Sequence, residues 1–321
     1  MEINTVLFKA LSENELVSIT KKIFGESAVL KKYELLKGGL FNTTYRIVTE
    51  TSDVILRVGP VHRELLQKYE ENLMEAEVLV DRLCLENGIP ASKVVFIDCS
   101  KTIVDRDFMA VERIESKPLS DPSIEREEYP PIFKECGAIL KKMHGIKGEK
   151  FGRAADIVAN KGSDTWYGAL KFELDCLFEK AAAFNVFTDE IIKKSYEFLK
   201  ENEKYLADIK EPKLIHADLW RGNVLVKGEK GSYRVVAIID GDRAIFGDTD
   251  WDIVTGWMMT ESFKEGYGLH KDYFENERKM HRKEVYILVQ SLLEMYIRLV
   301  QYPEPENFEY ALSKVKEILK F

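Results

Sequence analysis

Residues 213–240 read KLIHADLWRGNVLVKGEKGSYRVVAIID, and this stretch decides how the whole chain is interpreted. Two β-branched runs flank a glycine-containing turn at 227–231, which predicts a β-hairpin. Asn223 begins the first predicted strand and Asp240 ends the second, so both reach the same open end of the hairpin. Asp218 belongs to the loop just before Asn223. The sequence therefore predicts that three oxygen-bearing side chains converge.

The spacing of these side chains is the one that phosphoryl transfer requires. A carboxylate must orient or deprotonate the attacking hydroxyl, and hard oxygen ligands must hold Mg²⁺ against the nucleotide phosphates. His216-x-Asp218-x₄-Asn223 matches the H-x-D-x₄-N loop of kinases, and Asp240 follows on the next strand. We expect Asp218 to be the catalytic carboxylate and Asn223 and Asp240 to be the metal ligands. His216 is expected to brace the loop through hydrogen bonds rather than to act as a second base.

Two other interpretations of this stretch are weaker. Asp218 and Asn223 could merely cap a tight turn while Asp240 ends a strand, but this does not account for the whole combination. The pair Asp240-x-Asp242 could belong to a metal-dependent sugar transferase, which leaves the upstream loop unexplained. Asp242 is either a second metal contact or only a turn former.

Length and composition limit the number of lobes and the classes of partner that the chain can have. It has 321 residues, which suggests about two lobes. Lys and Arg number 47 and Asp and Glu 55, so the net charge is −8. This excess argues against nucleic acid or an anionic membrane as the main partner, because both favour basic patches. The four cysteines form no CxxC pair, which argues against a zinc ribbon or a redox dithiol.

The sequence shows no pattern typical of a secretory signal or a membrane span. The N-terminus lacks a basic region followed by an apolar segment. The longest apolar stretch, 285–300, is interrupted by polar and charged residues and is typical of a buried helix. We expect a cytoplasmic protein with reduced thiols.

The periodicity changes near residue 114. Before it, Ser12 and Glu15 form a capping box at the start of a helix, and a longer helix is predicted over 63–86. Glu70 and Glu71 on this longer helix are expected to lie on a solvated face. Five strand-like runs make a small sheet: 33–36, 44–48, 54–58, 94–97 and 108–111. Helical patterns then dominate at 132–143, 165–182, 188–207, 250–260, 281–301 and 306–320. This order predicts an α+β fold.

The segment 216–252 resembles the aminoglycoside phosphotransferase family, which has the protein-kinase-like fold. The family's HxDxxxxN loop, its Ile-Asp metal motif at Ile239-Asp240 and its GDxxxD segment at 247–252 occur in order. The string HADLWRGN is also similar to fructosamine kinases, and 137–144 is similar to the family's core helix ending in Leu-His. The resemblance implies that Asp248 and Asp252 brace loops rather than bind substrate.

This resemblance implies a two-lobed fold with unequal tasks. Residues 1–113 would form a nucleotide-binding lobe, with a small antiparallel sheet and one inserted helix. Residues 114–321 would form a mainly helical lobe with the catalytic hairpin and the acceptor site.

The family pattern also implies a phosphate-binding pair. Arg57 occupies the strand position at which protein kinases carry a lysine, and alternation places it opposite Val54, Leu56 and Val58. Arginine still binds phosphate oxygens, as a planar fork. Glu75 would be its helix partner, with Glu77 as the competing choice.

Further nucleotide contacts follow from the same resemblance. Gly39, Asn42 and Thr43 would belong to the hairpin turn that covers the phosphates. Glu112 and Ile114 would belong to the lobe connection whose main chain pairs with the purine. The implied cofactors are Mg²⁺ and ATP, with GTP as the alternative, because main-chain contacts do not distinguish the two.

The segment after Asp240 argues against a protein kinase. Only about ten residues precede the next predicted helix, no Ala-Pro-Glu follows, and Ala217 stands where many kinases carry an arginine. We therefore expect a monomer that phosphorylates a hydroxyl of a small, cationic acceptor. The first choice is an aminoglycoside or similar amino sugar, which would confer antibiotic resistance. The alternatives are a metabolic kinase for fructosamine, a choline-like alcohol or a sugar, and a catalytically silent nucleotide-binding module.

Overall fold

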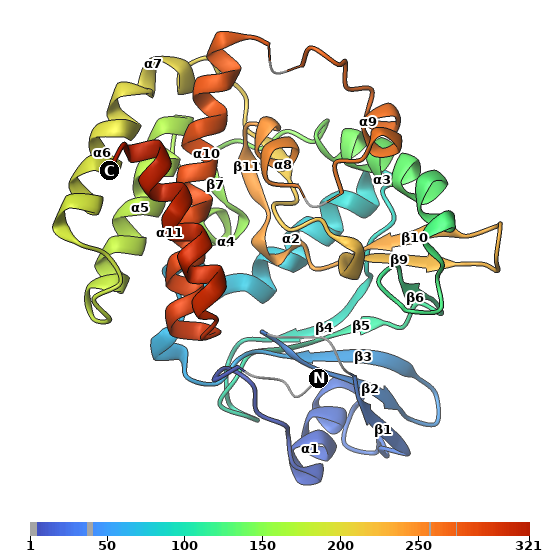
Figure 1. The fold of residues 1–321 in the computed structure, drawn as a ribbon. Helices are drawn as coiled ribbons and strands as arrows, with labels where there is room; N and C mark the ends of the chain where they lie inside the picture. The colour runs from blue at the N-terminus through green and yellow to red at the C-terminus, as the bar shows by residue number, and fades with distance from the viewer. Residues whose placement is uncertain (1–4, 37–40, 257, 274) are drawn as a thin grey trace. The chain divides into compact units, whose positions relative to one another are not determined.

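The computed structural model describes residues 5–36, 41–256, 258–273 and 275–321. They form two compact units, drawn in Figure 1. The first unit comprises Met1–Leu66 and Ser92–Glu115, and the second comprises Gln67–Ala91 and Ser116–Phe321. The helix that the sequence-based division at 113/114 placed in the first lobe therefore packs with the second unit.

The first unit is built on one antiparallel sheet. Its strands, in spatial order, are β1 (Lys32–Leu35), β2 (Thr43–Val48), β3 (Asp53–Val58), β5 (Phe108–Glu112) and β4 (Val94–Asp98). Buried residues alternate along β2 and β3, so that one face of the sheet forms the core. The five predicted strand runs all fall on these strands.

Helix α1 (Glu13–Phe24) covers this core. Ser12 caps it through the predicted box with Glu15, and Gly25 ends it. Leu16 and Ile19 of α1 are buried in the same cluster as the β2 and β3 side chains. The burial of this one helical face holds α1 to the unit.

The second unit is mainly helical, as Figure 1 shows. Its helices are α2 (Leu73–Glu86), α3 (Tyr129–Met143), α4 (Ala154–Val158), α5 (Trp166–Ala182), α6 (Asp189–Glu201), α7 (Glu203–Leu206), α8 (Asp250–Thr255), α9 (Glu261–Tyr267), α10 (Glu277–Tyr296) and α11 (Pro305–Leu319). Two three-stranded sheets accompany them. One has the order β10 (Arg234–Ile238), β9 (Val224–Lys227), β6 (Lys117–Pro118), and the other has the order β7 (Gly152–Arg153), β11 (Ile245–Gly247), β8 (Lys213–Ile215).

The predicted helix over 63–86 is wrong before residue 73. The chain forms two short 3₁₀ turns, Arg63–Leu65 and Lys68–Asn72, before α2 begins. Gln67 is extended between them, and its N–H donates to Glu70 Oε2 at 2.8 Å, which starts a new turn. The sequence suggested one continuous helix because the buried residues of the two turns have nearly the same spacing as those of a helix.

Other differences lie at element ends. The predicted helix 188–207 is divided at Asn202 into α6 and α7, and the end of the predicted helix 281–301 is a π-helical turn, Ile297–Gln301. Among the described residues, no helix combines the length and apolar character that crossing a membrane requires.

Candidate active site

The hairpin of β9 and β10 brings Asn223 and Asp240 together. Val226 pairs with Val235 in the antiparallel ladder. Beyond the end of β10, the N–H of Ile239 donates to the carbonyl of Asn223 at 3.0 Å, which extends the pairing by one step. Asp240 follows with a left-handed backbone, φ +66°. The chain therefore turns sharply beside Asn223, as the sequence predicted.

Asn223 also contacts the loop that carries Asp218. Its Nδ2 donates to the Asp218 carbonyl at 2.9 Å and lies 3.4 Å from Asp218 Oδ2. One amide side chain thus fixes both the main chain and the carboxylate of Asp218. The three predicted side chains converge in the second unit.

Asp218 lies in a strongly acidic environment. Burial is the main cause that raises the pKa of its carboxyl to about 7, and the nearby Asp240 and Glu294 carboxylates act in the same direction. The Arg243 guanidinium and the hydrogen bond from Asn223 act in the opposite direction. A carboxyl with a pKa near 7 can accept a proton at neutral pH.

His216 lies beneath the loop and is held in one orientation. Its Nε2 donates to the carbonyl of Ile239 at 3.1 Å, and its Nδ1 lies 3.3 Å from the N–H of Asp218. Burial lowers its pKa, which favours the neutral ring. The contacts are those of a loop brace.

Asp252 braces the same loop from helix α8. Its carboxylate accepts the N–H of His216 at 2.9 Å and the N–H of Ala217 at 2.8 Å. Ala217 has a left-handed backbone, φ +63°, which is uncommon for a residue with a Cβ. The two hydrogen bonds hold this conformation.

Asp248 has a different neighbourhood. Its Oδ2 accepts from Arg282 Nε at 2.8 Å and from the Tyr286 hydroxyl at 2.6 Å, and its Oδ1 accepts from the N–H of Asp250 at 3.1 Å. Burial raises the pKa of Asp248. It joins helix α10 to the start of α8.

Asp240 belongs to a group of three carboxylates with Asp242 and Glu77. One oxygen of each lies within 4.8 Å of the others, and both Asp242 and Glu77 are buried. A hard divalent cation fits such a donor set, because Mg²⁺ prefers oxygen ligands and offsets the repulsion between like charges. The predicted ligand Asp240 is therefore compatible with Mg²⁺, and Asp242 and Glu77 add further oxygens.

The structure distinguishes the two glutamates of α2. Glu75, the residue that the sequence favoured, is exposed, whereas the side chain of Glu77 is buried near Asp240. Residues two apart on a helix point in different directions, so only one of them can reach the buried face. Burial could not be assigned beforehand because both fit the helical pattern.

The predicted nucleotide residues of the first unit have varied surroundings. Arg57 lies on the partly exposed face of β3, opposite the buried Val54, Leu56 and Val58, as alternation predicted. Gly39 lies outside the described residues.

The other four are placed as follows. Asn42 and Thr43 are buried, and the Thr43 hydroxyl donates to the carbonyl of Lys9 at 3.2 Å. Glu112 is exposed at the end of β5, where its carboxylate accepts from Lys93 Nζ at 2.6 Å. Ile114 is partly buried. The Thr43 hydroxyl is thus engaged by the chain itself.

Sequence reasoning missed an ion pair beside this site. Glu70 was expected on a solvated face but is 3% exposed, and its Oε1 accepts from Arg243 NH2 at 3.1 Å. The expectation for Glu71 is correct, because it is exposed and pairs with Lys68. The extended residue Gln67, which ends the helical register, caused the error at Glu70.

Comparison with known proteins decides the family. The sequence model of the phosphotransferase enzyme family, APH, matches residues 32–282. The chain belongs to this family. The match includes the β9–β10 hairpin, the Asp240 turn and Asp252. A search of curated proteins finds no match.

Solved structures of phosphotransferases share the fold. Aminoglycoside phosphotransferase APH(4)-Ia has a TM-score of 0.68 at 18% identity, covering 95% of this chain and 98% of that one. A putative fructosamine-3-kinase from Haemophilus somnus 129PT has a TM-score of 0.65 at 16% identity, covering 95% and 96%. The GDP complex of aminoglycoside 2′-phosphotransferase-IIIa has a TM-score of 0.61 at 14% identity, covering 96% and 99%. The kinase-like α+β fold predicted from the sequence is confirmed.

Proposed function

We propose that this phosphotransferase moves the γ-phosphate of a nucleoside triphosphate to a hydroxyl of a small molecule. The observation that carries the proposal is the contact of Asn223 with Asp218 beside the Asp240 turn. Phosphoryl transfer depends on positioning and on compensation of charge. This group of side chains would supply the positioning, together with oxygen ligands for a Mg²⁺ that would compensate the charge.

Asp218 acts on the acceptor. Its carboxylate accepts a hydrogen bond from the acceptor hydroxyl, orients the oxygen for attack and takes up the proton. His216 and Asp252 keep the loop in place during this step. A positioned base of this kind contributes about 10²–10⁴-fold to the rate.

Asn223 and Asp240 would hold Mg²⁺, with Asp242 as an additional candidate. The bound ion would compensate the negative charge of the nucleotide phosphates. The oxygen-rich donor set of Asp240, Asp242 and Glu77 supports this assignment.

Nucleotide binding would also use the first unit. Arg57 would bind phosphate oxygens as a bidentate fork, and its position on the partly exposed face of β3 supports this role. Gly39, Asn42, Thr43, Glu112 and Ile114 remain predicted contacts. Glu75 remains the predicted helix partner of Arg57, with Glu77 as the alternative.

The nucleotide is ATP in our proposal, with GTP as the alternative. Similar structures contain AMP-PNP in one case and GDP in another. AMP-PNP is an adenine nucleotide and GDP is a guanine nucleotide, and each was bound by a similar protein rather than by this chain. Together they support either ATP or GTP as the nucleotide here.

The acceptor that we propose is an aminoglycoside or similar amino sugar. One similar structure, an APH(4)-Ia variant, is a ternary complex with AMP-PNP and hygromycin B. In this chain the net charge of −8 and the carboxylate of Glu294 near Asp218 favour a cationic acceptor. A fructosamine or another metabolic alcohol is the second candidate, supported by the similarity to a putative fructosamine-3-kinase. The retained Asp218, Asn223 and Asp240 speak against a silent module.

A nucleotide-consumption screen tests the proposal. The purified chain is incubated with Mg²⁺ and either ATP or GTP, and with aminoglycosides, glycated amines, choline and sugars in turn. We expect consumption only when one acceptor class is added, and a phosphorylated product by mass spectrometry. Tight binding of Mg-nucleotide without turnover on any acceptor would favour the silent module instead.

A further inference from the structure

The buried ion pair of Glu70 and Arg243 lies between helix α2 and the Asp240 turn. Arg243 follows Asp240-Gly241-Asp242 directly in a 3₁₀ turn, Gly241–Arg243. Its NH1 donates to the Tyr69 hydroxyl at 3.2 Å and its NH2 to Glu70 Oε1 at 3.1 Å. The arginine that ends the metal motif is therefore bound to the segment that leads into α2.

Glu70 is held by three donors at once. Besides Arg243, its carboxylate accepts from the N–H of Gln67 at 2.8 Å and from Gln301 Nε2 at 2.5 Å. Its side chain has no exposed surface. A buried carboxylate is tolerated when charged and polar donors satisfy it, as they do here. Glu70 thus ties the start of α2 to Arg243 and to the π-helical turn after α10.

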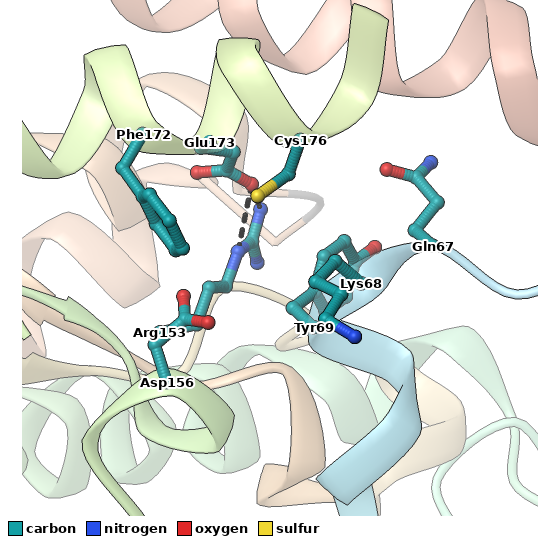
Figure 2. A pocket seen from close by; sticks show the side chains of 8 residues that line it. All are labelled: Gln67, Lys68, Tyr69, Arg153, Asp156, Phe172, Glu173 and Cys176. Carbon is teal, nitrogen blue, oxygen red and sulfur yellow. Dashed lines mark hydrogen bonds and ion pairs between the residues drawn. The ribbon is translucent and has the colours of Figure 1, made fainter. Parts of the chain in front are cut away.

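The main chain of Arg243 is fixed as well. Its carbonyl accepts from Arg153 NH1 at 3.0 Å. Figure 2 shows the Arg153 guanidinium directed at Glu173, with Tyr69 beside it. The Arg153 guanidinium lies 4.5 Å from the centre of the Tyr69 ring. Both the side chain and the backbone of Arg243 are consequently anchored through Tyr69 and its neighbours.

Helix α2 approaches the metal motif closely at this point. A Cβ on Gly241 would lie 2.7 Å from Val80 Cγ1 of α2, closer than such atoms pack. Three residues before Val80, the same helix carries Glu77, whose carboxylate lies near Asp240 and Asp242. The position of α2 therefore determines how many oxygens surround the proposed Mg²⁺.

We propose that Glu70 and Arg243 are a positioning pair that docks α2 against the Asp240 turn and so sets the affinity for Mg-nucleotide. The affinity part of this inference rests on the proposed function. The docking part does not, because it concerns the chain without ligand.

The matched variants are Glu70→Gln and Glu71→Gln. Glutamine offers one acceptor oxygen where Glu70 offers two, so its NH2 group would face a donor, either Arg243 or the pair of Gln67 and Gln301. Glu71 is the neighbouring glutamate of the same 3₁₀ turn, but its side chain is 39% exposed and accepts from Lys68 Nζ at 2.6 Å. Its substitution controls for the loss of one charge in this segment.

Hydrogen exchange of the full, ligand-free chain tests the docking. We expect amides of α2 to exchange about tenfold faster in Glu70→Gln than in Glu71→Gln, with the β9–β10 hairpin unchanged. Titration with Mg-AMP-PNP tests the affinity, and we expect it to weaken about tenfold or more in Glu70→Gln alone. Arg243→Lys, which keeps the charge but cannot reach Glu70 and Tyr69 together, should give intermediate values even if Glu70→Gln folds poorly.

Three results would overturn the inference. The first is that both glutamine variants match the unsubstituted chain in α2 exchange and in binding. The second is that exchange rises equally in every segment, which makes the pair a general stabilising contact. The third is that α2 loosens while binding is unchanged, which removes its link to the site. If the unsubstituted chain itself fails to bind Mg-AMP-PNP, the proposed function is wrong, and hydrogen exchange still decides the docking.

Discussion

The imidazole of His144 at the end of α3 contacts the carboxylate of Asp252, with 3.0 Å between Nε2 and Oδ2. The same Asp252 Oδ2 accepts the N–H of His216. The other ring nitrogen of His144 lies 2.7 Å from the Tyr267 hydroxyl, at the end of α9. A chain of hydrogen bonds therefore connects the ends of two helices to the loop of Asp218 and holds the main chain of that loop.

Asp252→Ala is expected to destabilise the fold and to slow turnover. It leaves the N–H groups of His216 and Ala217 without their acceptor, which costs about 1–3 kcal/mol for each buried donor. A shift of the Asp218 loop by about 1 Å would reduce kcat about 10²-fold. Denaturant unfolding and initial rates measure both effects. Asp164→Ala, at an exposed position, is the control, and equal behaviour of the two variants would refute the brace.

Asp218 gives a pH dependence of known sign. Its pKa in the folded, metal-free chain is about 7, above the ordinary value of 3.8. A raised pKa means that the folded state holds the proton more tightly, so the contribution of Asp218 to stability is complete below pH 4 and is lost as pH rises through about 7. Activity should change in the opposite sense, because the base must be ionised.

Carboxyl ¹³C NMR of the metal-free protein checks this titration directly. We expect one aspartate resonance with a midpoint near pH 7 that is absent in Asp218→Asn. The same variant should show a flatter dependence of unfolding free energy on pH between about 4 and 7. A midpoint near 4 for Asp218 would contradict the described environment.

Gly241→Ala tests the close approach of α2 to the metal motif. The new methyl would overlap Val80, and overpacking of this kind costs about 1–3 kcal/mol. Gly241 has no left-handed backbone, so packing alone is changed. In a double-mutant cycle with Val80→Ala, the double variant should be more stable than the sum of the single effects predicts. Strict additivity would show that the two side chains do not meet.

The architecture could be predicted where the signals were local. The alternation in β3, the capping box of α1 and the hairpin at 213–240 each depend on neighbouring residues, and all three agree with the structure. Strands of two or three residues, such as β6, β7 and β11, are too short to show a period, and they form by pairing with strands that are distant in sequence.

Only those site residues that lie close together in the sequence could be predicted to lie together in the fold. Spacing placed Asp218, Asn223 and Asp240 together because one hairpin connects them. Glu70 and Arg243 are far apart in sequence, and nothing local marks Glu70 as different from the exposed Glu71. Which of Glu75 and Glu77 is buried likewise depended on the face of α2 that packs against the rest of the unit.

Asp218→Asn provides the most direct test of the central claim. The amide keeps the size of the side chain but cannot accept the acceptor's proton. Binding of Mg-nucleotide should stay close to that of the unsubstituted chain, while phosphate transfer to the acceptor identified in the screen should fall about 10²-fold or more. Phosphorylation by Asp218→Asn at the unsubstituted rate would contradict the proposed role of this carboxylate.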